Sequence, residues 1–188
     1  MTCAMFKLQF DPRWISSLAS QYLIAGNAAA KDAAMLAAGK NIACRRLSRS
    51  NLETIYKWKS PRFVGLMDGN KDADISRCLL RAVEAIEAAD DRSAIVALIR
   101  ASADNAGLRG VQVPVASAIL TAIKPDRFTV IDYKALAALD CPQESPGVGF
   151  YLGYLCACRR IAAENNVSLR TLDRALWQWW TNQEKASA

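Results

Sequence analysis

The 188-residue chain contains no histidine. Imidazole is the usual general base beside a serine or cysteine nucleophile, and it is the commonest side-chain ligand of protein-bound metals. Its absence excludes Ser-His and Cys-His nucleophile pairs and histidine-ligated metal sites. Any catalysis by this chain must therefore use carboxylates, lysine, tyrosine, cysteine or backbone groups.

Glycine and proline are scarce, with nine and six residues, whereas alanine is frequent and gathers in runs. Alanine has the highest intrinsic helix propensity, and glycine and proline have the lowest. The clearest amphipathic segment is 72–89, where apolar residues recur at three- and four-residue steps. We therefore predict an all-α protein, with eight or nine helices in one compact domain over residues 1–188.

Capping residues and helix breakers set the expected helix limits. An aspartate followed by proline, Asp11-Pro12, is typical of a helix start, and the residue before a proline avoids helical backbone angles. Gly39 is expected to end the second helix, and Ser50 or Asn51 to cap the third. The expected helices cover residues 12–25, 28–38, 51–58, 72–89, 91–106, 114–123, 132–139, 148–164 and the stretch that follows Ser168.

The six cysteines are scattered, and their one close pair, Cys156 and Cys158, has C-x-C rather than C-x-x-C spacing. The longest apolar run, 148–158, is shorter than the ~18 residues that a membrane span needs. The N-terminal residues lack the basic and long apolar regions of a signal peptide. We therefore expect reduced thiols, no metal, no other cofactor, no membrane partner and a cytoplasmic location.

The formal net charge is +6. A moderate positive excess favours association with a polyanion, although it says nothing about the fold. It is compatible with a nucleic-acid partner and equally with a soluble protein whose surface is mildly basic.

Residues 107–140 carry the most information about function. A glycine turn at Gly110 leads into a helix that Pro114 begins, and backbone N–H groups at such a turn suit a phosphate oxygen. Further on, Asp132 opens a helix after the apolar stretch 128–131. Two plainer interpretations stay open, because Gly110 can be an ordinary turn glycine and Asp132 an ordinary helix cap.

This segment resembles the helix-hairpin-helix DNA glycosylase superfamily, which includes endonuclease III, adenine glycosylases and 8-oxoguanine glycosylases. Its members carry a Leu-Pro-Gly-(apolar)-Gly hairpin, a helix, an apolar approach and a catalytic aspartate. In this chain Leu-Arg-Gly-Val-Gln at 108–112 occupies the hairpin, and Phe-Thr-Val-Ile-Asp at 128–132 the approach. Asp132 follows Gly110 by 22 residues, the spacing expected for endonuclease III-like members.

Two departures from the family pattern matter for function. Gln112 replaces the second hairpin glycine, which puts close binding of the phosphate in doubt because glycine allows the nearest backbone approach. Pro114 stands where bifunctional members have their nucleophilic lysine. Because proline has no amine, the resemblance implies a monofunctional enzyme that uses an activated water rather than a Schiff base.

The resemblance implies a hydrolase of base excision repair that binds duplex DNA, with damaged duplexes among its candidate substrates. A nucleotide leaves the stack, the base–sugar bond stretches, and a carboxylate, here Asp132, stabilises the positive charge on the sugar. One alternative is a non-catalytic helix-hairpin-helix protein that binds nucleic acid or protein. Another is an unrelated helical interaction domain in which the motif arises by chance.

The candidate site residues fall into three groups. Asp132 is the candidate catalytic acid. The candidate DNA contacts are Gly110, Val111, Gln112, Val113, Lys124, Arg127 and Lys134. A cluster of aromatic and basic residues that could hold a base consists of Tyr56, Trp58, Lys59 and Arg62. For this cluster the alternative is a tryptophan anchored in the core at a helix end, and for Lys134 it is a solvated charge.

Overall fold

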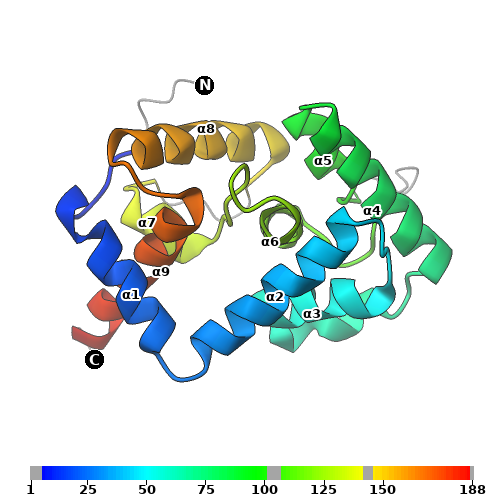
Figure 1. Cartoon of the computed structure of the whole chain (residues 1–188), viewed down its shortest axis with the longest axis horizontal. Helices are drawn as coiled ribbons and strands as arrows, with labels where there is room; N and C mark the ends of the chain where they lie inside the picture. The colour runs from blue at the N-terminus through cyan, green and yellow to red at the C-terminus, as the bar shows by residue number, and fades with distance from the viewer. Residues whose placement is uncertain (1–5, 101–106, 142–145, 187–188) are drawn as a thin grey trace. The chain divides into compact units, whose positions relative to one another are not determined.

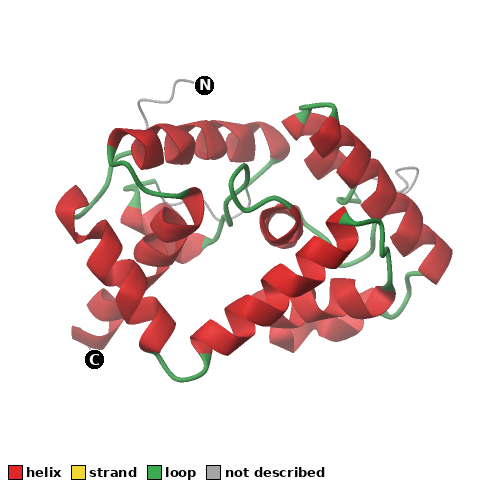
Figure 2. Ribbon diagram, in the orientation of Figure 1, coloured by secondary structure: helices red, strands yellow, loops and turns green. Residues whose placement is uncertain are grey.

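The computed structural model describes residues 6–100, 107–141 and 146–186, and its secondary structure is helical. Over these ranges it contains nine α-helices and two 3-10 helices and no strand (Figure 2), with one isolated bridge between Ile99 and Leu108. The all-α prediction is therefore confirmed. None of the described helices is both long and apolar enough to cross a membrane.

The contacts of the chain group into two compact units, and Figure 1 labels the helices of both. The first unit joins Met1–Ala30 to Asp126–Ala188, and the second is Lys31–Pro125. The prediction of a single domain stays a prediction. The candidate turn around Gly110 belongs to the second unit, and Asp132 belongs to the first.

The first unit is built around its last helix. It consists of η2 (Pro12–Trp14), α1 (Ile15–Ile24), α7 (Tyr133–Ala138), α8 (Val148–Glu164) and α9 (Leu169–Ala186). The helix α9 contacts α1, α7 and α8. Its three tryptophans make ring contacts, in the pairs Tyr22–Trp177, Phe10–Trp179 and Tyr133–Trp180. Such pairs stabilise a fold by about 0.5–1.5 kcal/mol each beyond burial, so these tryptophans are packing residues.

The second unit is built around a buried helix. It begins within α2 (Ala28–Ala43) and continues through α3 (Arg49–Lys59), η3 (Pro61–Met67), α4 (Asp72–Glu87), α5 (Asp91–Val96) and α6 (Val113–Ile123). Every residue of α6 except Pro114 is buried, as expected for a helix that is apolar on all sides. Its two hydroxyls bond within the helix, from Ser117 to the carbonyl of Pro114 and from Thr121 to the carbonyl of Ser117.

Most of the expected helix limits are close to the observed ones. Asp11, Asp90 and Ser168 each accept a hydrogen bond from a backbone N–H in the first turn, as a cap does. The cap of α3 is Ser48, two residues earlier than expected. The expectation that the fifth helix continues toward Gly107 was wrong, because α5 ends at Val96; residues 101–106 lie outside the described ranges.

The prediction that Gly39 ends the second helix was also wrong. Helix α2 runs through Gly39 to Ala43 because the glycine is there for packing. A Cβ built on Gly39 would lie 2.0 Å from the carbonyl oxygen of Ala122 in α6. The two helix backbones therefore touch at a point where only a hydrogen atom fits.

The surroundings of two glycines inside helices predict opposite effects of alanine substitution on stability. We expect Gly39→Ala to lower the free energy of unfolding by about 1–3 kcal/mol, the cost of overpacking, despite alanine's better helix propensity. Gly153→Ala, within α8, should raise it by about 0.5–1 kcal/mol, because no atom lies within 4 Å of the added Cβ. Urea denaturation of both variants measures the difference, and stabilisation by Gly39→Ala would contradict the contact.

Candidate nucleic-acid interface

The turn that precedes α6 requires glycine at position 110 for two reasons. Gly110 has a φ of +76°, a left-handed conformation that other residues rarely adopt. A Cβ at Gly110 would also lie 2.8 Å from Cβ of Leu66, so the turn presses against η3. The turn expected from the sequence is therefore present, and its glycine serves backbone conformation and packing together.

Two buried side chains hold this turn in place. The hydroxyl of Tyr56 donates to the carbonyl oxygen of Gly110 at 2.9 Å. Asn70 accepts from the N–H of Arg109 at 2.7 Å and donates to the carbonyl of Arg109 at 3.0 Å. Burial raises the pKa of Tyr56 above its ordinary value, which keeps the phenol protonated as a donor. The sequence did not single out Asn70, so its role as a clamp was missed.

The turn leads directly into the N-terminus of α6. Gln112 is the N-cap residue, and its side chain makes no capping hydrogen bond. The positive end of the helix dipole therefore has no side-chain acceptor at the cap. The φ of Gln112 is −102°, which any residue adopts, so the replacement of the second hairpin glycine by Gln112 introduces no backbone strain.

An open groove of about 570 Å³ lies beside this turn within the second unit. Its lining comes from the end of α3 with Ser60, from η3, and from residues 108–112, 114 and 115, together with Arg100. Arg100 and Arg109 are exposed, and among the described residues neither has an ion-pair partner. The groove thus offers two guanidinium groups next to the start of α6.

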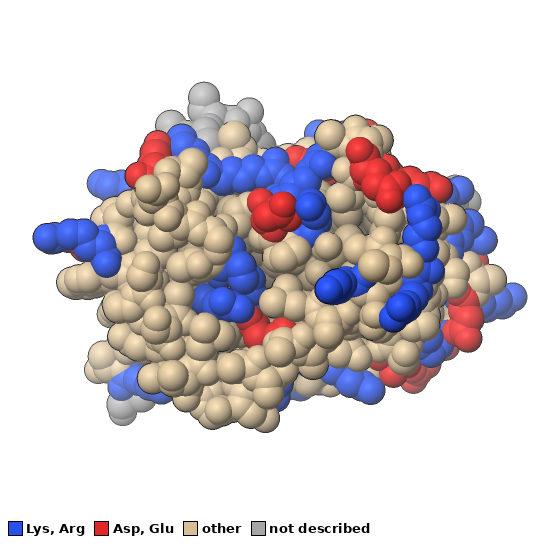
Figure 3. All heavy atoms as spheres, in the orientation of Figure 1, with Lys and Arg blue, Asp and Glu red and all other residues tan. Residues whose placement is uncertain are grey.

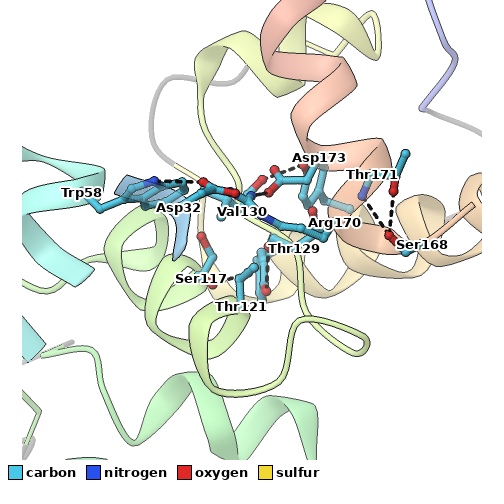
Figure 4. A network of polar contacts seen from close by, with 12 residues as sticks. Asp32, Trp58, Ser117, Thr121, Thr129, Val130, Ser168, Arg170, Thr171 and Asp173 are labelled. Carbon is cyan, nitrogen blue, oxygen red and sulfur yellow. Dashed lines mark hydrogen bonds and ion pairs between the residues drawn. The ribbon is translucent and has the colours of Figure 1, made fainter. Parts of the chain in front are cut away.

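The expected base pocket of Tyr56, Trp58, Lys59 and Arg62 does not form as one surface. Tyr56 is buried, and the Trp58 indole donates to Asp32 at 3.1 Å (Figure 4), which supports the anchored role for this tryptophan. Lys59 is half-buried, Arg62 is exposed, and neither lines the groove.

Instead, two apolar side chains that the sequence did not single out line the groove. Phe63 and Leu66 of η3 are 59% and 57% exposed, whereas Met67 is fully buried. The 3-10 helix after Pro61 gives three residues per turn, so the apolar run 63–67 cannot bury all its members on one side.

Asp132 caps α7 in the first unit. Its carboxylate accepts from the N–H of Ala135 at 2.9 Å, and the side chain is half-buried. The cap interpretation is therefore confirmed. A cap bond neither requires nor excludes a catalytic role for this carboxylate, so that expectation stays a prediction.

The approach to Asp132 is fixed by two buried tyrosines of α8. Tyr151 donates to the carbonyl of Thr129 at 3.1 Å and Tyr154 to the carbonyl of Val130 at 2.7 Å. These bonds satisfy an extended segment that has no sheet partner in the described structure. Burial, with the charge of Asp132 among smaller contributions, holds the pKa of Tyr154 well above its ordinary value.

The three basic residues expected to contact DNA differ in their exposure and in their partners. The Lys134 ammonium lies 2.8 Å from Glu184 and 4.4 Å from the centre of the Trp177 ring, and it lowers the pKa of Glu184. Lys134 is therefore not a solvated charge, because it ties α7 to α9. Arg127 is half-buried, with its guanidinium over the Phe128 ring, while Lys124 is exposed at the end of α6.

Charge of both signs is distributed over the surface. On the face drawn in Figure 3, Lys and Arg side chains are spread among acidic and uncharged ones. A further charged pair, Arg170 and Asp173 of α9, is buried (Figure 4). Within the described ranges, no cluster of three or more acidic or cysteine side chains is arranged to hold a metal ion.

Comparison with protein-family models, curated proteins and solved structures gives no significant match for this chain.

The clamp on the turn predicts a stability effect. We expect Tyr56→Phe to lower the free energy of unfolding by about 1–3 kcal/mol, because the half-buried Gly110 loses the donor to its carbonyl oxygen. Tyr133→Phe, at a side chain 62% exposed, should change it by less than about 0.5 kcal/mol. Thermal or urea unfolding measures the free energy of unfolding of both variants. Equal losses would show that the hydrogen bond of Tyr56 adds no stability of its own.

Proposed function

We propose that this protein binds DNA through the Gly110 turn and hydrolyses a base–sugar bond, as a monofunctional helix-hairpin-helix glycosylase does. The observation that carries the proposal is the glycine turn that runs into the uncapped N-terminus of α6 beside Arg100 and Arg109. Helix α5, the bridge at Ile99 and Leu108, and α6 correspond in this proposal to the helix, hairpin and helix of the motif.

The binding part rests on simple electrostatics. A DNA phosphate carries a full negative charge, and backbone N–H groups with a helix N-terminus favour it. Arg109 adds a charged donor from within the turn. Tyr56 and Asn70 hold the turn from its buried side, so little ordering of the backbone is required when a phosphate binds.

The chemical part rests on Asp132 and on the lack of an amine at Pro114. One oxygen of Asp132 is oriented by the N–H of Ala135, which fixes the direction of the carboxylate. In the proposed reaction the base leaves, positive charge develops on the sugar, and this carboxylate stabilises it while water completes the hydrolysis. No imine forms at position 114, because proline cannot supply a nucleophilic amine.

A non-catalytic DNA-binding protein is the second candidate. The observation that favours it is the cap that Asp132 forms on α7, which accounts for this aspartate without any reaction.

The binding proposal predicts a salt-dependent affinity for duplex DNA. If about five phosphates are neutralised, the log–log slope of affinity against salt should be about −4 to −5. Arg109→Gln should weaken binding and make the slope shallower by about one. Lys40→Gln removes an exposed cation of α2 that does not line the groove, and it should have less effect. Fluorescence anisotropy at several salt concentrations measures these slopes, and no binding at low salt would reject the proposal.

The catalytic proposal predicts that Asp132→Asn separates capping from chemistry. Asparagine caps helices about as well as aspartate, so the free energy of unfolding should change by less than about 1 kcal/mol. Base release should fall by ~10²-fold or more, the scale for losing one electrostatic stabiliser.

The matched control is Asp90→Asn, which changes the cap of α5 in the same way. The assay measures base release from a panel of lesion-bearing duplexes. Full base release by Asp132→Asn from a duplex on which the wild-type protein acts would assign Asp132 to the fold alone. No base release by the wild-type protein from any duplex of the panel would favour the non-catalytic candidate.

A further inference from the structure

The rim of the groove in the second unit combines exposed apolar side chains with positive charge. Phe63 and Leu66 of η3 are more than half exposed, and both line the groove together with the Gly110 turn. Exposed apolar groups that gather at a groove mark contact sites more often than those scattered singly. The rim is therefore a candidate surface for a ligand that has an apolar part.

These side chains are held outward by the structure around them. Pro61 starts η3, and the fully buried Met67 anchors its last turn. The backbone of Leu66 lies against Gly110, where a Cβ would come within 3.2 Å of the Leu66 carbonyl carbon. Phe63 and Leu66 thus belong to a segment that Met67 anchors, next to the turn that is the candidate phosphate site.

An exposed aromatic side chain beside positive charge favours one kind of nucleic-acid ligand over another. The backbone of an intact duplex offers phosphates and sugars but no exposed base face. An unpaired nucleotide offers a negative phosphate and a flat apolar base within one residue, and bases stack on aromatic side chains in single-strand sites. The groove volume of about 570 Å³ lies within the roughly 300–1,000 Å³ usual for small-molecule sites.

We propose that this groove binds an unpaired nucleotide, with its phosphate at the Gly110 turn and its base stacked on Phe63. The inference rests on the proposed nucleic-acid binding and deepens it, because it names single-stranded segments as ligands of the second unit. Arg100 and Arg109 supply the charge that complements the strand, and Leu66 supplies the neighbouring apolar contact.

The test compares two fluorescein-labelled probes by anisotropy with the full chain. One probe is an oligothymidylate of about 20 nucleotides, longer than the roughly 4–16 nucleotides of common single-strand sites, and the other is a duplex of the same length. The variants are Phe63→Ala, Phe63→Leu and Phe63→Trp, and the control is Ile24→Ala, an 81% exposed side chain of the other unit. Thermal unfolding checks that each variant is folded.

We expect Phe63→Ala to weaken oligothymidylate binding by about fivefold or more, the lower end of one lost base–aromatic stack. Phe63→Leu should weaken it too, because it keeps the apolar contact but loses the ring, whereas Phe63→Trp should retain it. Duplex affinity should be the same for all variants, and Ile24→Ala should alter neither probe's affinity.

Two results would overturn the inference, and they differ in what they say of the proposed function. If the wild-type protein binds duplex but Phe63→Ala leaves oligothymidylate binding unchanged, the stacking site is absent and the proposed DNA binding stands. If neither probe binds at low salt, both proposals fail.

Discussion

Because α6 is buried at every position except Pro114, its neighbours must approach its backbone closely. Gly39 lets α2 touch Ala122, and Gly110 lets the preceding turn press against Leu66. The same burial fixes where α6 begins, so the turn and the helix N-terminus are set by packing rather than by any ligand. The candidate interface is thus an exposed end of an otherwise buried element.

In the first unit, aromatic side chains pack the helices together and fix the segment that leads to Asp132. The tryptophans of α9 pack on α1, on α7 and on Phe10, and two tyrosines of α8 bind the carbonyls that lead to Asp132. An extended segment without a sheet therefore keeps its backbone satisfied, and Asp132 begins α7 from a fixed position.

Phosphate binding and base stacking depend on different parts of the second unit. Phosphate binding depends on the Gly110 turn, its buried clamps and the adjacent arginines. Base stacking depends on Phe63, which the packing of Leu66 and Met67 keeps beside that turn. Since a phosphate and its base belong to one nucleotide, the two contacts would reinforce each other within a single ligand.

The sequence by itself determined the helical class, most helix limits, the Gly110 turn and the Asp132 cap, since these depend on local propensity and capping. It misplaced the end of α2, because Gly39 breaks helices locally but serves a contact between helices distant in sequence. Only the tertiary structure decided that Trp58 turns to Asp32 and Lys134 to Glu184, and that Phe63 is left exposed. The physical reason is that burial and pairing of a side chain depend on which partners the fold brings near, which spacing along the chain does not encode.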